Sequence, residues 1–230
     1  MKSRLWKTTI LLVIILIICS LFSYRTSKIK PKDKNKPIVA EKKKTESIDI
    51  NKLREKYQNN DIVAYIEIPG VTSSIVLQSD DNDYYLNHNY KKEYDNKGSI
   101  VLDYRNELSD RKLLIYGHSG KEKELPFLKL NNYIEKDYWK KHNSINLYTM
   151  KGIRKYKIYS SYIETSDYDY VNLNSFNGLS WEEHINKLKN KSLYETGIEL
   201  EENDNIIILQ TCSMNDEGFQ KYHLVIGKEV

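Results

Sequence analysis

Cys212 is the residue of this chain best suited to nucleophilic chemistry. It is the only cysteine outside an apolar N-terminal segment, and it follows the apolar run at 206–211, which is typical of a buried strand. Chains outside the cytosol usually hold their cysteines in disulfides, so a single thiol at a strand end is either a small buried hydrophobe or a nucleophile. A thiol nucleophile needs a base or a cation beside it and a donor for the oxyanion formed at the attacked carbonyl.

His118 is the strongest candidate for that base among the five histidines of the chain. It follows the apolar run at 113–116 and a glycine, and Ser-Gly comes after it, so it lies at a strand end from which an imidazole can reach across a groove. The other histidines are His88 and His142, which we expect to be exposed in polar loops, His184, which we expect to be exposed on a helix, and His223, for which packing and exposure both stay open.

Charge is unevenly distributed along the 230 residues. The chain carries 36 Lys/Arg and 32 Asp/Glu, but residues 1–50 hold twelve of the basic and four of the acidic ones, so residues 51–230 have a net charge of −4. A mildly acidic domain argues against nucleic-acid binding. The sequence has no paired-cysteine motif, HExxH motif, EF-hand spacing or phosphate-binding glycine loop, so neither a metal site nor a cofactor is expected.

An apolar segment at residues 8–24 contains no charged residue. Its length fits a short spanning helix or the core of a signal peptide, and because no clear cleavage site follows, we favour an uncleaved anchor. Residues 1–7 would be a cytoplasmic tail, 25–50 a lysine-rich tether and 51–230 an extracellular catalytic domain, in a single-pass protein of the cell membrane. The basic residues after the segment outnumber those before it, which by the positive-inside rule alone would favour the opposite orientation.

Many short apolar runs with little helix between them indicate a mainly β fold, a mostly antiparallel barrel. The predicted strands are 62–68, 74–77, 100–102, 113–116, 145–149, 156–164, 206–211 and 223–226. The predicted helical segments are 51–58, 83–87, 126–133, 134–142 and 181–188, the last with Ser180 as its N-cap. Residues 166–204 form a long, helix-bearing insertion before the cysteine strand.

Four stretches of the chain resemble sortases, membrane-anchored cysteine transpeptidases of Gram-positive bacteria. Residues 209–212 resemble the family's Thr-Leu-x-Thr-Cys signature, and residues 116–118 its histidine motif, with the histidine 94 residues before the cysteine. Residues 76–86 and 98–106 are similar to class B in particular, as are the helical start and the insertion. The resemblance covers essentially all of residues 51–230.

The resemblance implies an eight-stranded sortase-type barrel with N-terminal helices, which binds a sorting motif near the C-terminus of a surface protein. Cys212 would attack the carbonyl after the threonine of the motif and form a thioacyl enzyme. An amine of peptidoglycan or of its lipid-linked precursor would then resolve it. His118 would protonate the leaving amine and deprotonate the incoming one. The positions that the resemblance assigns to substrate binding are Asn82, Leu86, Tyr116, Gln210, Thr211 and Lys221.

The sequence departs from the family where sortases place an arginine, at the start of the last strand. Tyr222 stands there, and no arginine follows Arg154. Tyr222 can donate a hydrogen bond but carries no fixed charge. Lys221 points to the opposite face unless the strand bulges, and Arg105 or Arg111 could reach the site from another loop. Two other interpretations stay open: a sortase-fold protein without turnover that binds a peptide or assists assembly, and a cysteine hydrolase that releases the acyl group to water.

Overall fold

The computed structural model describes residues 48–120, 124–212 and 221–230. Their elements, in chain order, are α2 (Ile50–Tyr57), β1 (Ile62–Ile68), β2 (Thr72–Leu77), the 3-10 helix η1 (Tyr84–Leu86), β3 (Ile100–Leu102), β4 (Lys112–Tyr116), the 3-10 helix η2 (Leu128–Ile134), α3 (Lys136–Lys141), β5 (Ser144–Thr149), β6 (Gly152–Glu164), the 3-10 helix η3 (Asp169–Val171), α4 (Trp181–Asn190), β7 (Ile206–Cys212) and β8 (Tyr222–Glu229).

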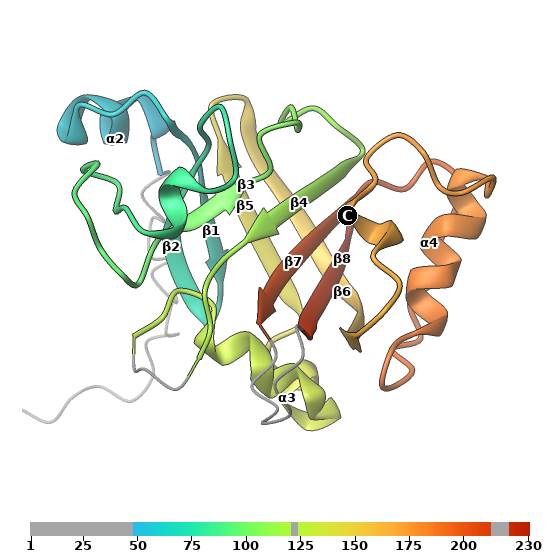
Figure 1. The fold of residues 1–230 in the computed structure, drawn as a ribbon. Helices are drawn as coiled ribbons and strands as arrows, with labels where there is room; N and C mark the ends of the chain where they lie inside the picture. Colours follow the sequence, from blue (N-terminus) through green and yellow to red (C-terminus); the bar gives the residue numbers. More distant parts are fainter. Residues whose placement is uncertain (1–47, 121–123, 213–220) are drawn as a thin grey trace, which may run out of the picture. The chain divides into compact units, whose positions relative to one another are not determined.

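These eight strands form a closed barrel in the order β1-β2-β3-β4-β7-β8-β6-β5 (Figure 1). The prediction of a mainly β, eight-stranded barrel with a helix-bearing insertion is confirmed. Six of the strand pairs described are antiparallel, whereas β2 with β3 and β4 with β7 are parallel. The β4–β7 pair matters most for the site, because parallel neighbours end at the same edge of a sheet.

Local sequence signals account for most element boundaries. β1 alternates buried and half-buried residues along its whole length, as expected for a strand with one face in the core. Helix α2 begins at Asp49, whose carboxylate accepts hydrogen bonds from the backbone N–H groups of Asn51 and Lys52. Ser180 caps α4 in a capping box with Glu183, which confirms its predicted role.

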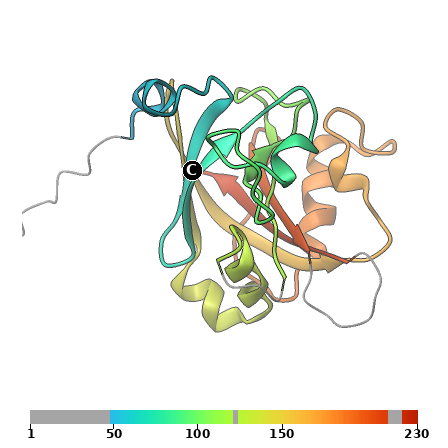
Figure 2. The ribbon, with the colours of Figure 1, turned by 60° about the vertical axis from the view of Figure 1, so that its left-hand side comes forward.

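Apolar side chains are buried both inside the barrel and between the barrel and the insertion. On β7, Leu209 belongs to the core cluster inside the barrel, whereas Ile208 belongs to the cluster that includes Ile185 and Leu188 of α4. Burial on both faces explains why this strand reads as a continuous apolar run rather than an alternating one. Figures 1 and 2 show α4 alongside the barrel wall and α3 near the end at which β7 finishes.

No helix among residues 48–120, 124–212 and 221–230 is long and apolar enough to cross a membrane. The predicted anchor at residues 8–24 and the predicted tail at residues 1–7 lie outside the described residues, as does nearly all of the predicted tether.

Candidate active site

Strand alternation places Cys212 on the outer face of the wall formed by β4, β7 and β8. Because Ile208 packs toward α4, Gln210 and Cys212 follow it on the same face of β7. Cys212 is exposed and its thiol is free. Burial around the sulfur nevertheless raises the pKa of this thiol above the ordinary value of about 8.5. The group is therefore mainly protonated near neutral pH, and attack on a carbonyl needs a base to take the proton.

Two hydrogen bonds hold the segment of His118 against the end of β7. The Gly117 N–H donates to the carbonyl of Gln210 at 3.2 Å, which extends the β4–β7 ladder by one residue. The Thr211 hydroxyl donates to the carbonyl of Gly117 at 2.7 Å. Thr211 is buried, so this bond is shielded from water. The residue before the thiol is thus bonded to the residue before the imidazole.

The imidazole of His118 has a defined partner on its other side. Its Nε2 lies 2.8 Å from the carbonyl oxygen of Leu86. A carbonyl can only accept a hydrogen bond, so Nε2 carries the proton and Nδ1 of the neutral ring is left as a base. Gly98 makes this approach possible: a Cβ built there would lie 2.3 Å from the Leu86 oxygen and 2.9 Å from Cδ2 of His118.

Tyr222 lies directly opposite Cys212 in the β7–β8 register, and that register has no bulge. Its ring packs edge-on against Tyr168 of the insertion, with the ring centroids 5.9 Å apart. Burial and the neighbouring Cys212 raise the pKa of Tyr222, so its hydroxyl keeps its proton and can donate. Lys221 precedes it, half-buried, before the first residue of β8.

Arg105, one candidate for the missing arginine, is held by a buried carboxylate. Its guanidinium donates to both oxygens of Asp103, at 2.8 Å each, and to the carbonyl of Val171 in the insertion at 3.0 Å. Asp103 also accepts from the Tyr116 hydroxyl at 2.6 Å and from the Asn82 amide at 3.1 Å. Although burial raises the pKa of Asp103, the hydrogen bonds from Arg105 and Tyr116 lower it overall, so Asp103 is ionised.

Arg111 and Arg154 lie away from Cys212. Arg111 precedes β4, at the opposite end of that strand from Tyr116, and its guanidinium lies over the Trp181 ring and donates to a backbone carbonyl of the insertion. Arg154 lies beside Glu229, the last residue of β8, whereas Cys212 pairs with the first. Neither is placed to donate to a carbonyl at Cys212.

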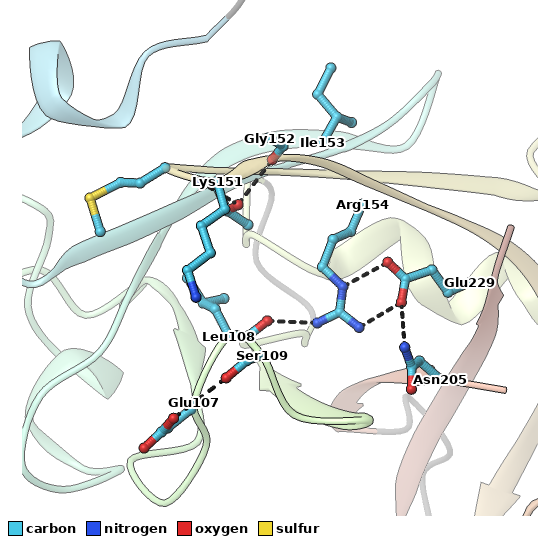
Figure 3. Close-up of a pocket in the computed structure, with 11 residues that line it drawn as sticks. Glu107, Leu108, Ser109, Lys151, Gly152, Ile153, Arg154, Asn205 and Glu229 are labelled. Atoms are coloured by element: carbon cyan, nitrogen blue, oxygen red, sulfur yellow. Dashed lines mark hydrogen bonds and ion pairs between the residues drawn. The ribbon is translucent and has the colours of Figure 1, made fainter. Parts of the chain in front are cut away.

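Arg154 instead lines a cavity of about 480 Å³ at its own end of the barrel. Figure 3 shows its guanidinium between the carboxylate of Glu229 and the carbonyl of Leu108, with Asn205 donating to the same carboxylate. The contacts are 2.7–2.8 Å to Glu229 and 2.7 Å to Leu108. This arginine therefore ties β6 to the end of β8.

The six residues predicted to bind substrate have different surroundings in the structure. Asn82 and Tyr116 both donate to the carboxylate of Asp103, and the side-chain Oδ1 of Asn82 also accepts from the Tyr104 N–H at 2.9 Å. Gln210 accepts from the hydroxyl of buried Tyr170, in η3 of the insertion, at 2.9 Å. The remaining three have other placements: Leu86 binds His118 through its backbone, Thr211 binds Gly117, and Lys221 lies beside Tyr222.

Sequence reasoning missed two polar side chains that organise this region, Asp103 and Asn131. Asp103 lies within one of the stretches that resemble class B sortases, but no role was assigned to it. Asn131, in η2, donates to Ser119 Oγ at 2.5 Å and to the carbonyl of Cys212 at 3.3 Å. Its only sequence signal is a polar residue amid the apolar positions of a short helical segment.

The histidine predictions need correction: His88 and His142, which we expected to be exposed, are half-buried. His184 is buried, not exposed, and its Nε2 lies 2.9 Å from the ammonium of buried Lys112. Its ring stacks on Phe176 with the centroids 4.3 Å apart. His184 lies three residues after Trp181 and four before Leu188, on the same buried face of α4. Helical periodicity therefore already favours burial, and the prediction was wrong because it weighed the polar side chain more heavily. His223, left open, is fully buried and bonded to Ser161.

The chain matches known proteins over most of its length. The family model of the sortase domain matches residues 66–230. Sortase B of Listeria monocytogenes is 35% identical over 188 residues, which cover 79% of this chain and 73% of that protein. A Staphylococcus aureus sortase B–substrate complex matches with a TM-score of 0.68 and 26% identity, covering 79% of this chain and 91% of that one. Clostridium perfringens sortase B matches with a TM-score of 0.70 and 27% identity, covering 78% and 99%.

An exposed, unpaired thiol opposite Tyr222, a histidine segment bonded to the same strand end and these matches agree with one another. They also agree with the resemblance noted in the sequence. The chain belongs to the sortase family, in class B, and is a cysteine transpeptidase of cell-wall sorting.

Proposed function

We propose that Cys212 is the nucleophile of this transpeptidase and attacks the carbonyl after the threonine of a C-terminal sorting motif. The sulfur–carbon bond forms as the carbon–nitrogen bond breaks, which leaves the surface protein as a thioester on Cys212 and releases the C-terminal fragment as an amine. An amine of peptidoglycan or its precursor then attacks the thioester and restores the thiol. The observation that carries this proposal is the bond from Thr211 to Gly117, which joins the ends of the two candidate segments.

His118 acts as the base and acid of both steps. With Nε2–H directed at the Leu86 carbonyl, Nδ1 is the nitrogen able to take the thiol proton, and it passes that proton to the departing amine. In the second half of the reaction it takes a proton from the incoming amine. The raised pKa of Cys212 makes this transfer necessary, because little thiolate exists before the substrate arrives.

Tyr222 takes the place of the family's arginine as the donor to the oxyanion. Its register position opposite Cys212 and its protonated hydroxyl support this role. Arg105 is committed to Asp103, and Arg154 lies at the other end of β8. A neutral donor stabilises the developing charge less than a cation does, so we expect slower turnover than an arginine at this position would allow.

The sorting motif binds on the outer face of β4, β7 and β8, beside the insertion. Support comes from the Asp103 network, which holds Asn82, Arg105 and Tyr116, and from the solved substrate complex of the Staphylococcus aureus relative. Leu86, Gln210 and Lys221 complete the substrate-binding set, whereas the side chain of Thr211, which we also expected there, is buried inside the barrel and bonded to Gly117. The charge-free apolar segment at residues 8–24 supports a single-pass membrane anchor with the catalytic domain outside the cell.

A product assay tests this function. The protein without residues 1–47 is incubated with quenched fluorescent peptides that carry a threonine before the scissile bond, with and without a glycine-peptide amine. A transpeptidase gives the amide product with the amine present. Carboxylate alone in both arms indicates a hydrolase, and no cleavage indicates a sortase fold without turnover. Cys212→Ala and His118→Asn should each abolish or greatly reduce cleavage, by about 10²-fold or more for His118, with the thermal midpoint retained.

A further inference from the structure

Asn131 connects the two segments that carry the proposed nucleophile and base. Its amide nitrogen lies 2.5 Å from the hydroxyl oxygen of Ser119, the residue after His118, and 3.3 Å from the carbonyl oxygen of Cys212 itself. The residue is half-buried in the middle of η2. One side chain from a third segment therefore touches both halves of the site.

The Asn131 amide lies just beyond the last backbone hydrogen bond between the β4 and β7 segments. Backbone pairing between β4 and β7 ends at Tyr116 with Gln210, and the Gly117 N–H adds one bond to the Gln210 carbonyl. Beyond that point no backbone hydrogen bond between the two segments is found among the described residues. There the Asn131 amide donates one hydrogen bond to each segment, to Ser119 on one side and to Cys212 on the other, and so links them in place of a backbone hydrogen bond.

The 3-10 helix that presents Asn131 is firmly anchored. Leu130 and Tyr133, on either side of it, are fully buried. The Tyr133 carbonyl accepts hydrogen bonds from the Ser161 hydroxyl at 3.2 Å and from the Tyr194 hydroxyl at 2.9 Å. Just before η2, the Phe127 N–H donates to the carbonyl of His118 at 3.0 Å. A side chain on such a fixed backbone can hold its partners in place instead of following them.

The chemistry of the acceptors also fixes the amide orientation. The Cys212 carbonyl only accepts hydrogen bonds, so the NH₂ group of Asn131, and not its oxygen, must face it. Its second hydrogen is then directed at Ser119 Oγ. We propose that Asn131 is a positioning residue of the reaction, which holds the segment of His118 against the peptide group of Cys212 and so maintains the relative placement of imidazole and thiol.

This role rests on the proposed functions of Cys212 and His118, but it is separate from them. Asn131 contacts the backbone of one and the neighbour of the other, and no step of the reaction passes through it. Its loss therefore affects the alignment of the reacting groups, which is the kind of change that lowers turnover far more than it lowers substrate binding or stability.

Two variants and a neighbouring control test the proposal. Asn131→Asp keeps the shape of the side chain but replaces the donor with a carboxylate that repels the Cys212 carbonyl, and Asn131→Ala removes the group. Asn132→Ala changes the next residue, whose side chain is exposed. We expect both Asn131 variants to lower kcat by about 10- to 100-fold with KM little changed, and Asn132→Ala to behave as wild type. Alkylation of Cys212 by a small neutral reagent at alkaline pH should keep the wild-type rate in all three.

The outcomes separate positioning from packing. An Asn131→Asp protein with the same kcat as Asn132→Ala would overturn the proposal. Alkylation of Cys212 that slows in the Asn131 variants in proportion to kcat would also overturn it, since the thiol itself would then be displaced. Ser119→Ala should cause a smaller loss of kcat than Asn131→Ala, because it removes only one of the two hydrogen bonds of Asn131. In the Asn131→Ala background that bond is already absent, so Ser119→Ala should cause no further loss, and fully additive losses would count against the proposal. Cys212→Ala, run alongside, distinguishes the two claims: a fully active Cys212→Ala protein would overturn the proposed nucleophile, whereas an inactive one beside an active Asn131→Ala would overturn only this inference.

Discussion

The Thr211 hydroxyl donates a hydrogen bond to the carbonyl oxygen of Gly117 over 2.7 Å, inside the barrel and between residues 94 apart in the chain. Each of the two precedes a residue of the proposed catalytic pair. Side-chain alternation puts Thr211 inside and Cys212 outside, so the same strand end supplies a buried tether and an exposed nucleophile. The hydrogen bond between Thr211 and Gly117 thereby holds the Cys212 and His118 segments at a fixed distance, without direct contact between the thiol and the imidazole.

Replacing Thr211 with valine tests this tether, because valine keeps the shape but cannot donate. The Gly117 carbonyl is left without this partner in a buried position, which lowers the free energy of unfolding by about 1–3 kcal/mol. We expect turnover of a sorting peptide to fall as well, since the His118 segment loses its attachment. Urea unfolding and peptide kinetics measure the two effects. Thr165→Val, at an exposed position, is the control, and equal behaviour of the two variants would contradict the tether.

Gly98 offers a second test, with a well-matched control. Its φ is +61°, and an alanine Cβ would lie 2.3 Å from the Leu86 oxygen, the acceptor of His118. Gly178 has a φ of +83° but nothing within 4 Å of a built Cβ. Both Gly→Ala changes introduce backbone strain of about 1 kcal/mol, but only Gly98→Ala should also displace Leu86 and His118 and reduce kcat. Equal kcat in the two variants, measured with one peptide, would show that His118 does not depend on this contact.

Tyr222→Phe removes only the hydroxyl proposed to bind the oxyanion. Losing one such donor lowers kcat by about 10²- to 10³-fold in comparable sites. We expect Tyr222→Phe to lower kcat by that factor while its ring keeps the contact with Tyr168. Tyr168→Phe, which also keeps this contact, is the control and should stay active. Tyr222→Arg should be at least as fast as wild type. A Tyr222→Phe enzyme with wild-type kcat would eliminate the hydroxyl from the mechanism.

Buried Lys112 makes stability depend on pH. Burial lowers its pKa to about 7, with Asp169 opposing the shift and Arg105 adding to it, whereas an unfolded chain has a lysine pKa of about 10.4. Between these values the unfolded chain binds a proton that the folded one does not, so the contribution of Lys112 to stability increases with pH, by up to about 1.4 kcal/mol per pH unit. Below about pH 7 both states are protonated and the contribution is constant.

The comparison of wild type with Lys112→Met isolates this effect. The free energy of unfolding, measured with urea at several pH values from 7 to 10, should shift in favour of wild type as the pH rises. Exposed Lys136, replaced by methionine, provides a baseline for the loss of a surface charge. A difference between wild type and Lys112→Met that does not vary with pH would mean that the ammonium stays protonated in the folded state, in spite of its burial.

The sequence predicted the strands that carry the site more accurately than it predicted the contacts around it. The apolar runs before Cys212 and His118 depend on local periodicity, which a single sequence displays directly. The position of Tyr222 followed from the resemblance to sortases, and its pairing with Cys212 is visible only in the structure. The Asp103 carboxylate accepts hydrogen bonds from residues up to 21 positions away, and Asn131 reaches Cys212 from 81 positions away. Such hydrogen bonds form only when the barrel closes and brings distant segments together. No local sequence pattern predicts which distant side chains will donate to the same buried carboxylate or backbone carbonyl.

The proposed mechanism depends above all on an acyl group carried by Cys212. Intact-mass analysis of the protein without residues 1–47, mixed with a cleavable sorting peptide and quenched in acid, measures this directly. We predict an adduct with the mass of the peptide acyl fragment, mapped by proteolysis to Cys212, removed by hydroxylamine and absent from Cys212→Ala. A protein that cleaves the peptide with no adduct at Cys212, or that forms the adduct equally well as Cys212→Ala, would contradict the mechanism.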